Sequence, residues 1–287
     1  MLTRVLTGAA ILALLIGAWW FDRSRVGGPD LATAALGSLL MLAAIGELQV
    51  LGGATAGRRV AGRLLGALWL LLLVLPVAVP HAVTRQVAGL GLPLAALAAS
   101  LCVVTRLAAG PGPGVARLAG TLWFPVAYVG GMGCLVGLLA RGALDYAVGV
   151  TLVAKSSDIG GYFAGTLLGR HKLAPLVSPK KTVEGAVGGV LLPAVVATLV
   201  LPGRSLGTPV DGGLPVTLPT DAPLLALYGA VIGMLAIVSD LSESLLKRSC
   251  SVKDSGRFFG TSGGFLDLID SLLLVGACAL AYTAAVS

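Results

Sequence analysis

The chain has 287 residues, of which 56% are hydrophobic and only 11% are charged, and its mean hydropathy is +0.96. Because a soluble domain carries about 25% charged residues, this composition excludes an ordinary soluble protein and indicates an integral membrane protein. The net charge of +7 does not indicate a nucleic-acid-binding protein, since the basic residues lie in segments between apolar runs, as they do in membrane proteins.

Apolar runs predict an all-α, polytopic bundle of about nine transmembrane helices, because a spanning helix needs roughly 20 mostly apolar residues. The runs lie near 5–20, 31–51, 64–80, 87–104, 118–140, 144–155, 186–201, 224–239 and 264–286. The run at 144–155 is short, and we expect it to continue as a broken helix past Lys155. We therefore divide the chain into N-terminal transmembrane helices (1–140) and a C-terminal transmembrane region (141–287) with polar loops at 155–185 and 240–263.

The basic residues predict the orientation of this bundle. With the N-terminus in the cytoplasm and nine spans, five of the 20 basic residues fall outside, namely Arg23, Arg25, Arg85, Arg141 and Arg204. The remaining 15 fall on the cytoplasmic side, as the positive-inside rule requires. Both polar loops are then cytoplasmic, and we expect a multi-pass protein of the cell inner membrane with its site at that face.

Carboxylates at the edges of the last two apolar runs are the strongest chemical signal. Asp240 closes one run, while Asp267 and Asp270 open the next and are three residues apart, so a helix would place them on one face. Ionisable groups at a membrane boundary are expensive and usually functional. Because Mg²⁺ prefers oxygen ligands and keeps waters for substrate phosphates, we expect these three carboxylates to bind Mg²⁺.

Cations and glycines surround these carboxylates in the sequence. Lys247, Arg248 and Lys253 follow Asp240, and the glycines at 256, 260, 263 and 264 would let backbone amides approach phosphate oxygens closely. A metal with flanking Lys and Arg is a typical arrangement for phosphoryl-group chemistry. The alternative is a solvated juxtamembrane loop that binds anionic lipid headgroups.

The first polar loop contains Ser-Pro-Lys-Lys-Thr-Val-Glu-Gly at 178–185. Two lysines and two hydroxyls stand directly before an expected helix start, with Glu184 in its first turn. Such a segment is a plausible seat for a nucleoside triphosphate, because helix N-termini bind phosphates. An N-capped helix with lysines on the cytoplasmic side is the simpler interpretation.

The run from Ser244 to Asp270 resembles the signature of the phosphatidate cytidylyltransferase (CDP-diacylglycerol synthase) family. That signature reads Ser-x-apolar-Lys-Arg, four residues, Lys-Asp-x-small, an apolar residue, Pro or Gly, x, His-Gly-Gly, and finally Asp-Arg-apolar-Asp. Every spacing is matched here without a gap, and the first loop is similar to the family's Lys-x-Ser-Asp and Ser-Pro-Lys-Lys-Thr-x-Glu-Gly stretches. The motifs cover about the last 135 residues of the chain.

The resemblance implies a reaction of phosphatidic acid with CTP that gives CDP-diacylglycerol and pyrophosphate, with Mg²⁺ as cofactor. It implies catalytic roles for Asp240, Asp267, Lys247 and Lys253, and Mg²⁺ ligation by Asp240 and Asp267 with Asp270 close by. The residues implied to bind the substrates are Lys155, Asp158, Ser178, Lys180, Lys181, Glu184, Arg248, Gly263 and Gly264. The expected partners are CTP, phosphatidic acid and the bilayer, without nucleic acid, and a homodimer is the candidate assembly.

The chain departs from the signature at two positions, with Ser262 where the family has His and Leu268 where it has Arg. These departures leave the full activity an open question. Two other classes remain as alternatives, a CTP-dependent polyprenol- or phytol-type lipid kinase and a membrane transporter. Glu47 lies inside the second apolar run, where it either faces a polar cavity or forms a hydrogen bond to a neighbouring helix.

Overall fold

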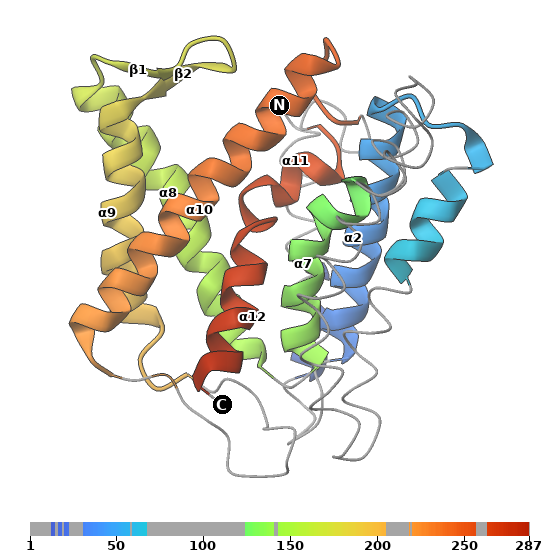
Figure 1. The fold of residues 1–287 in the computed structure, drawn as a ribbon. Helices are drawn as coiled ribbons and strands as arrows, with labels where there is room; N and C mark the ends of the chain where they lie inside the picture. The colour runs from blue at the N-terminus through green and yellow to red at the C-terminus, as the bar shows by residue number, and fades with distance from the viewer. Residues whose placement is uncertain are drawn as a thin grey trace. The chain divides into compact units, whose positions relative to one another are not determined.

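The computed structural model describes residues 13–14, 17–18, 20–22, 31–57, 59–67, 124–140, 143–204, 218, 220–256 and 263–286. Most of them are helical (Figure 1). The elements are α2 (Leu31–Leu51), α7 (Phe124–Ala140), α8 (Leu144–Leu168), β1 (Lys172–Ala174), β2 (Ser178–Thr182), α9 (Val183–Val200), α10 (Ala222–Ser249), α11 (Phe265–Ile269), the 3-10 helix η3 (Asp270–Leu272) and α12 (Val275–Val286).

Several of these helices are long and apolar enough to cross a membrane. In the described part of the chain they are Ala32–Leu51, Val183–Val200 and Ala222–Ser249, and a further pair, Phe265–Leu272 and Val275–Thr283, is bent by 45° at its break. The all-α membrane class is therefore confirmed. The predicted run at 87–104, most of those at 5–20 and 64–80, and the start of that at 118–140 lie outside the described residues, so the count of nine spans stays a prediction.

The chain forms two compact units, which we describe separately. The first unit comprises 1–142, 210–213 and 254–268. In it α2 packs against α7, and a Cβ at Gly37 would come within 3.0 Å of Val136, so the glycine permits the close approach of the two helices. The buried Asp22 caps the N-terminus of α2, since its carboxylate accepts hydrogen bonds from Ala32 N (2.9 Å), Thr33 N (2.8 Å) and Thr33 Oγ1 (2.7 Å).

The second unit comprises 143–209, 214–253 and 269–287, and it is built on α8, α9 and α10 (Figure 1). Glycines let the helix backbones touch: a Cβ at Gly160 would collide with the carbonyl oxygen of Gly188, and one at Gly233 would lie 2.7 Å from Gly189 O. Small residues at helix contacts are typical of membrane bundles. Ser157 Oγ of α8 lies 2.7 Å from Gly189 O of α9 and 3.3 Å from Gly233 O of α10, so one hydroxyl links all three helices.

Three local expectations for this unit were wrong. The loop expected from residue 240 does not begin there, because α10 continues to Ser249 and carries Asp240, Lys247 and Arg248. The helix that begins at Leu144 runs unbroken to Leu168, so Lys155 and Asp158 lie on α8 and not in a loop or a broken span. The break lies instead in the last apolar run, between η3 and α12. In place of a loop before α9, β1 and β2 form an antiparallel hairpin in which Lys172 pairs with Thr182 and Ala174 pairs with Ser178.

The start of α9 agrees with the sequence. Thr182 is the N-cap residue, its hydroxyl accepts a hydrogen bond from Gly185 N at 3.1 Å, and Glu184 lies in the first turn. A carboxylate in the first turn also complements the helix dipole. The lysines Lys180 and Lys181 therefore lie on β2, directly before this helix start.

Candidate functional site

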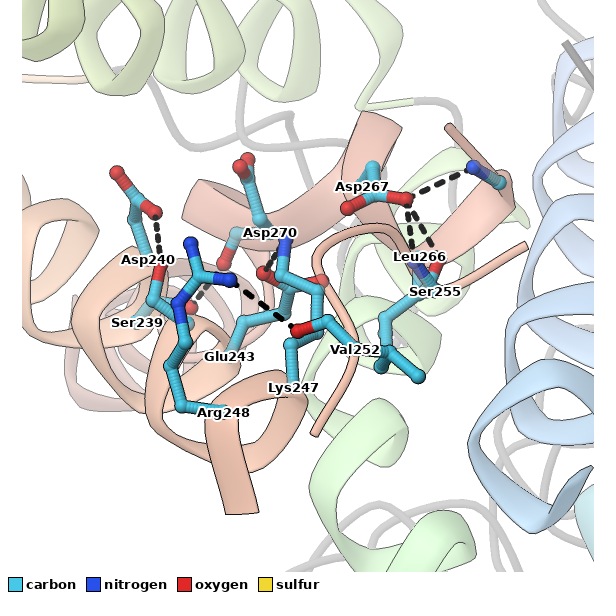
Figure 2. Close-up of polar contacts among 12 residues, drawn as sticks. Ser239, Asp240, Glu243, Lys247, Arg248, Val252, Ser255, Leu266, Asp267 and Asp270 are labelled. Atoms are coloured by element: carbon cyan, nitrogen blue, oxygen red, sulfur yellow. Dashed lines mark hydrogen bonds and ion pairs between the residues drawn. The ribbon is translucent and has the colours of Figure 1, made fainter. Parts of the chain in front are cut away.

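Three carboxylates of the second unit form an acidic cluster. The ligand atoms of Asp240, Glu243 and Asp270 all lie within 4.8 Å of one another (Figure 2). Asp240 and Glu243 are three residues apart on α10 and so share one face of that helix. The backbone of η3 is fixed beside α10 because Ser239 Oγ donates a hydrogen bond to the carbonyl oxygen of Asp270.

Each carboxylate of this acidic cluster is paired with a lysine. Lys181 Nζ lies 2.6 Å from Asp240 Oδ2, Lys155 Nζ lies 3.3 Å from Asp270 Oδ1, and Lys247 Nζ lies 2.5 Å from Glu243 Oε2. The Glu243 side chain is fully buried and that of Lys247 is only 12% exposed. Buried charges are tolerated only when they are paired, so the lysines account for the presence of three carboxylates in one place.

A pocket of about 330 Å³ lies in the same unit. Its walls come from α8, the hairpin, the start of α9 and Ile237 of α10, and its polar lining includes Asp158, Lys180 and Lys181. The volume is within the range of small-molecule sites. The carboxylate of Asp158 lies 3.8 Å from the Lys155 ammonium.

Lys181 belongs to both features. It lines the pocket and it is also the partner of Asp240 in the acidic cluster. The pocket and the acidic cluster are therefore joined through one side chain, and an anion in the pocket would lie beside a group of oxygen ligands that can hold a cation. This combination suits a substrate that carries phosphates.

The Glu184 side chain, which the family resemblance implies to bind a substrate, contacts the residues directly before β1. Its carboxylate accepts hydrogen bonds from the backbone of Arg170 (3.1 Å) and His171 (3.2 Å), and its Oε1 lies 2.6 Å from His171 Nδ1. These contacts attach the start of the hairpin to the start of α9. Its role in nucleotide binding stays a prediction, as does that of Ser178, which begins β2.

The first unit contains the remaining carboxylate of the motif. Asp267 Oδ2 accepts hydrogen bonds from Ser255 N (2.9 Å), Ser255 Oγ (2.7 Å) and Gly264 N (2.8 Å), as the dashed lines in Figure 2 show. The structure thus brings together Asp240 and Asp270 of the three predicted metal ligands. For Asp267 the metal role stays a prediction from the motif.

The basic residues at the end of α10 are more exposed. Arg248 Nη1 donates a hydrogen bond to Val252 O at 3.3 Å, and Lys253 lies exposed in the turn that follows. Gly263 has a positive φ of 91°, which favours glycine. Ser262 lies outside the described residues, and Leu268 is half-buried near the end of α11.

Sequence reasoning missed Glu243. It stands between two predicted residues, three after Asp240 and four before Lys247, so a helical reading of 240–248 would have placed all three on one face. The expectation of a loop there concealed this spacing. Ser157 is the serine of the Lys-x-Ser-Asp stretch, but the motif gave no indication that its hydroxyl joins three helices.

Comparisons with known proteins identify the family of the chain. The model of a family described as "Cytidylyltransferase family" matches residues 2–286, so the chain belongs to the cytidylyltransferase family. The chain is similar to three bacterial proteins that are each named phosphatidate cytidylyltransferase. That of Staphylococcus epidermidis is 38% identical over 151 residues (52% of this chain, 53% of the relative), that of Bacillus subtilis 41% over 132 residues (46% and 45%), and that of Helicobacter pylori 38% over 133 residues (46% and 45%). The chain thus spans about half the length of the curated relatives it matches.

Proposed function

We propose that this chain is a phosphatidate cytidylyltransferase, which converts phosphatidic acid and CTP to CDP-diacylglycerol and pyrophosphate. The observation that carries the proposal is the position of Lys181, which lines the pocket and pairs with Asp240 of the acidic cluster at 2.6 Å. A nucleotide and a cation bound at these two features would be neighbours. The names of the relatives support the same reaction.

The acidic cluster fits Mg²⁺. Its donors are carboxylate oxygens, which hard divalent cations prefer, and they are close enough together to share one ion. We propose that Asp240 and Asp270 hold the ion with Glu243, and we propose a metal role for Asp267 from the motif alone. When bound, Mg²⁺ would neutralise phosphate charge in the transition state.

The chain's own residues would bind and orient two anions. In the proposed reaction a phosphate oxygen of phosphatidic acid forms a bond to the α-phosphorus of CTP, and the bond between that phosphorus and the bridging oxygen breaks, so that pyrophosphate leaves with the electron pair. Lys180 and Lys181 would offset the repulsion between the anions from the pocket, and Lys247, Arg248 and Lys253 from the end of α10. The nucleophile is already an anion, so no strong general base is required, and Ser262 in place of His is compatible with turnover.

We further propose that the protein has about nine spans in the cell inner membrane and that its site faces the cytoplasm. The distribution of basic residues supports this orientation, since 15 of 20 lie on that side in the nine-span topology. CTP then reaches the pocket from the cytoplasm and the lipid from the bilayer. A homodimer is the proposed assembly.

The test is turnover by the purified protein in detergent with labelled CTP, Mg²⁺ and phosphatidic acid. We expect a labelled CDP-lipid and one pyrophosphate for each product formed. A phosphorylated alcohol formed from an added polyprenol would indicate a kinase instead. The proposal fails if no CDP-lipid forms and CTP does not bind.

The two departures from the family signature are tested separately. We expect Ser262→His and Leu268→Arg, alone and together, to change the rate of a protein that is already active. If only the double variant forms CDP-lipid, the natural chain is an inactive relative.

A further inference from the structure

Glu47 is the only charged residue of α2, and the structure shows what its carboxylate binds. Oε1 accepts a hydrogen bond from Phe265 N at 2.9 Å, and Oε2 accepts one from Leu266 N at 2.9 Å and lies 2.9 Å from Ser255 Oγ. All of these residues belong to the first unit. The carboxylate therefore caps the start of α11, and the cost of a charge in an apolar helix is offset by three hydrogen bonds.

The glycines of the motif make room for this carboxylate. A Cβ at Gly264 would collide with both carboxylate oxygens of Glu47, and a Cβ at Gly256 would lie 2.5 Å from Oε1. We expected these glycines to allow backbone amides to approach phosphate. In the structure the Glu47 carboxylate occupies this space. A side chain at position 256 or 264 would collide with it, so both positions require glycine without reference to a phosphate.

Glu47 and Asp267 hold the same two backbone segments. Ser255 Oγ lies 2.9 Å from Glu47 Oε2 and 2.7 Å from Asp267 Oδ2, so one hydroxyl bridges the two carboxylates. Gly264 N donates to Asp267, and the next two backbone amides, those of Phe265 and Leu266, donate to Glu47. A shift of Glu47 would therefore move the residues that orient Asp267.

We propose that Glu47 is a positioning residue, which fixes the backbone around Ser255 and Gly264 and thereby the carboxylate of Asp267 for the reaction. The inference rests on the proposed function, in which Asp267 is catalytic. It also assigns a role to a residue of the N-terminal part of the chain, which lies outside the motifs at 155–185 and 244–270.

Asp22 supplies a matched control in the same unit. Its carboxylate also accepts two backbone hydrogen bonds and one from a hydroxyl, but these come from Ala32 and Thr33 at the start of α2. Glu47→Gln and Asp22→Asn each replace a carboxylate by an amide, which keeps the shape and loses one acceptor oxygen. If both caps were merely structural, the two variants would behave alike.

The experiment measures kcat, the KM for CTP, the Mg²⁺ concentration for half-maximal rate, and amide hydrogen exchange of the peptide over 263–272. For Glu47→Gln we expect faster exchange, a higher Mg²⁺ requirement and a kcat reduced about 10²-fold, the cost of a displacement of about 1 Å. The KM for CTP should change much less. Asp22→Asn should leave kcat, Mg²⁺ requirement and exchange at 263–272 as in the wild type.

Other results would overturn the proposal. If Glu47→Gln keeps the wild-type kcat and Mg²⁺ requirement, or if its exchange at 263–272 is unchanged, Glu47 does not position Asp267. If Glu47→Gln does not fold, Glu47→Asp, which retains both oxygens on a shorter stem, should show the same pattern to a smaller degree. If the wild type forms no CDP-lipid, the proposed function fails with the catalytic part of this inference, while hydrogen exchange, which needs no substrate, still tests the cap.

Discussion

The two units contain carboxylates with different kinds of partners. In the second unit Asp240, Glu243 and Asp270, the acidic cluster, are paired with the ammonium groups of Lys181, Lys247 and Lys155. In the first unit Glu47 and Asp267, the capping carboxylates, accept hydrogen bonds from backbone amides and from Ser255.

The carboxylates of the acidic cluster can exchange their lysine partners for other ligands, whereas the capping carboxylates cannot exchange their backbone amides. A lysine side chain is flexible and can turn from a carboxylate to a phosphate, so a pair such as Lys181 and Asp240 can open when substrates bind. Backbone amides are held in place by the fold. The acidic cluster is therefore suited to bind a cation, and the capping carboxylates are suited to fix a loop.

The largest effect is expected at the acidic cluster. Asp240→Asn removes the charge that lies beside both Lys181 and the proposed cation, and we expect turnover of CTP and phosphatidic acid to fall about 10²–10³-fold. Turnover is measured with labelled CTP on protein that elutes as the wild type does in size exclusion. Asp145→Asn is the control, since Asp145 pairs with Arg204 at 4.0 Å elsewhere in the unit. A similar loss in both variants would argue against a specific role of Asp240.

The next effect is steric and concerns the capping carboxylates. Gly264→Ala places a methyl group on the Glu47 carboxylate, and we expect it to destabilise the protein by about 1–3 kcal/mol, as overpacking does. Thermal unfolding in detergent measures the change. Gly57→Ala is the control, because a Cβ there meets no atom within 4 Å. In a Glu47→Ala background the same substitution should cost less, and full additivity would show that Glu47 is not the group in the way.

A smaller effect is expected at the residue that joins pocket and acidic cluster. Lys181→Gln should raise the KM for CTP about tenfold, since a hydrogen bond to a charged group contributes ~1.5 kcal/mol at the lower end of its usual range and about 1.4 kcal/mol corresponds to a factor of ten. Lys172→Gln, an exposed residue of β1, should leave it unchanged. An unchanged KM for CTP in Lys181→Gln would argue that the pocket does not bind the nucleotide.

The smallest effect is expected at the hydroxyl that bridges the capping carboxylates. Ser255→Ala leaves Glu47 and Asp267 with their backbone partners and should cost about 1 kcal/mol in the free energy of unfolding. Ser255→Thr retains the hydroxyl and should cost less in the same unfolding measurement. An alanine variant as stable as the wild type would show that the backbone amides alone hold the pair.

The long apolar elements could be predicted from the sequence, because hydropathy alone defines a membrane helix. The predicted run at 31–51 coincides with α2, and the lysines before α9 precede a helix start as expected. The extension of α8 could not be predicted, since Ser, Asp and Gly residues after Lys155 have low helix propensity and are held helical by contacts with α9. The hairpin was missed because β2 contains Pro-Lys-Lys and lacks an alternating apolar pattern.

The sequence predicted which residues belong to the candidate site, but it did not predict which side chains form ion pairs or hydrogen bonds with each other. The motif identified Asp240, Asp267 and Asp270, yet these carboxylates have partners that are 59, 12 and 115 positions away, respectively. Long-range contacts of this kind depend on how helices pack, which the local sequence does not encode. The same holds for Glu47, whose partners lie more than 200 residues further along the chain.

The length of α10 bears on how far its carboxylates lie from the end of the helix at Ala222. An α-helix rises ~1.5 Å per residue, so the 28 residues of α10 extend over roughly 42 Å, well beyond a hydrocarbon core of about 30 Å. Asp240 lies about 27 Å along this axis from Ala222, a distance close to the thickness of the hydrocarbon core. Arg248 lies about 12 Å further along the same axis, beyond the length that the hydrocarbon core can cover. If Ala222 lies at one face of the hydrocarbon core, the length of α10 places Asp240 and Glu243 at the opposite face. The phosphate of a membrane lipid could then reach these carboxylates while its acyl chains remain in the bilayer.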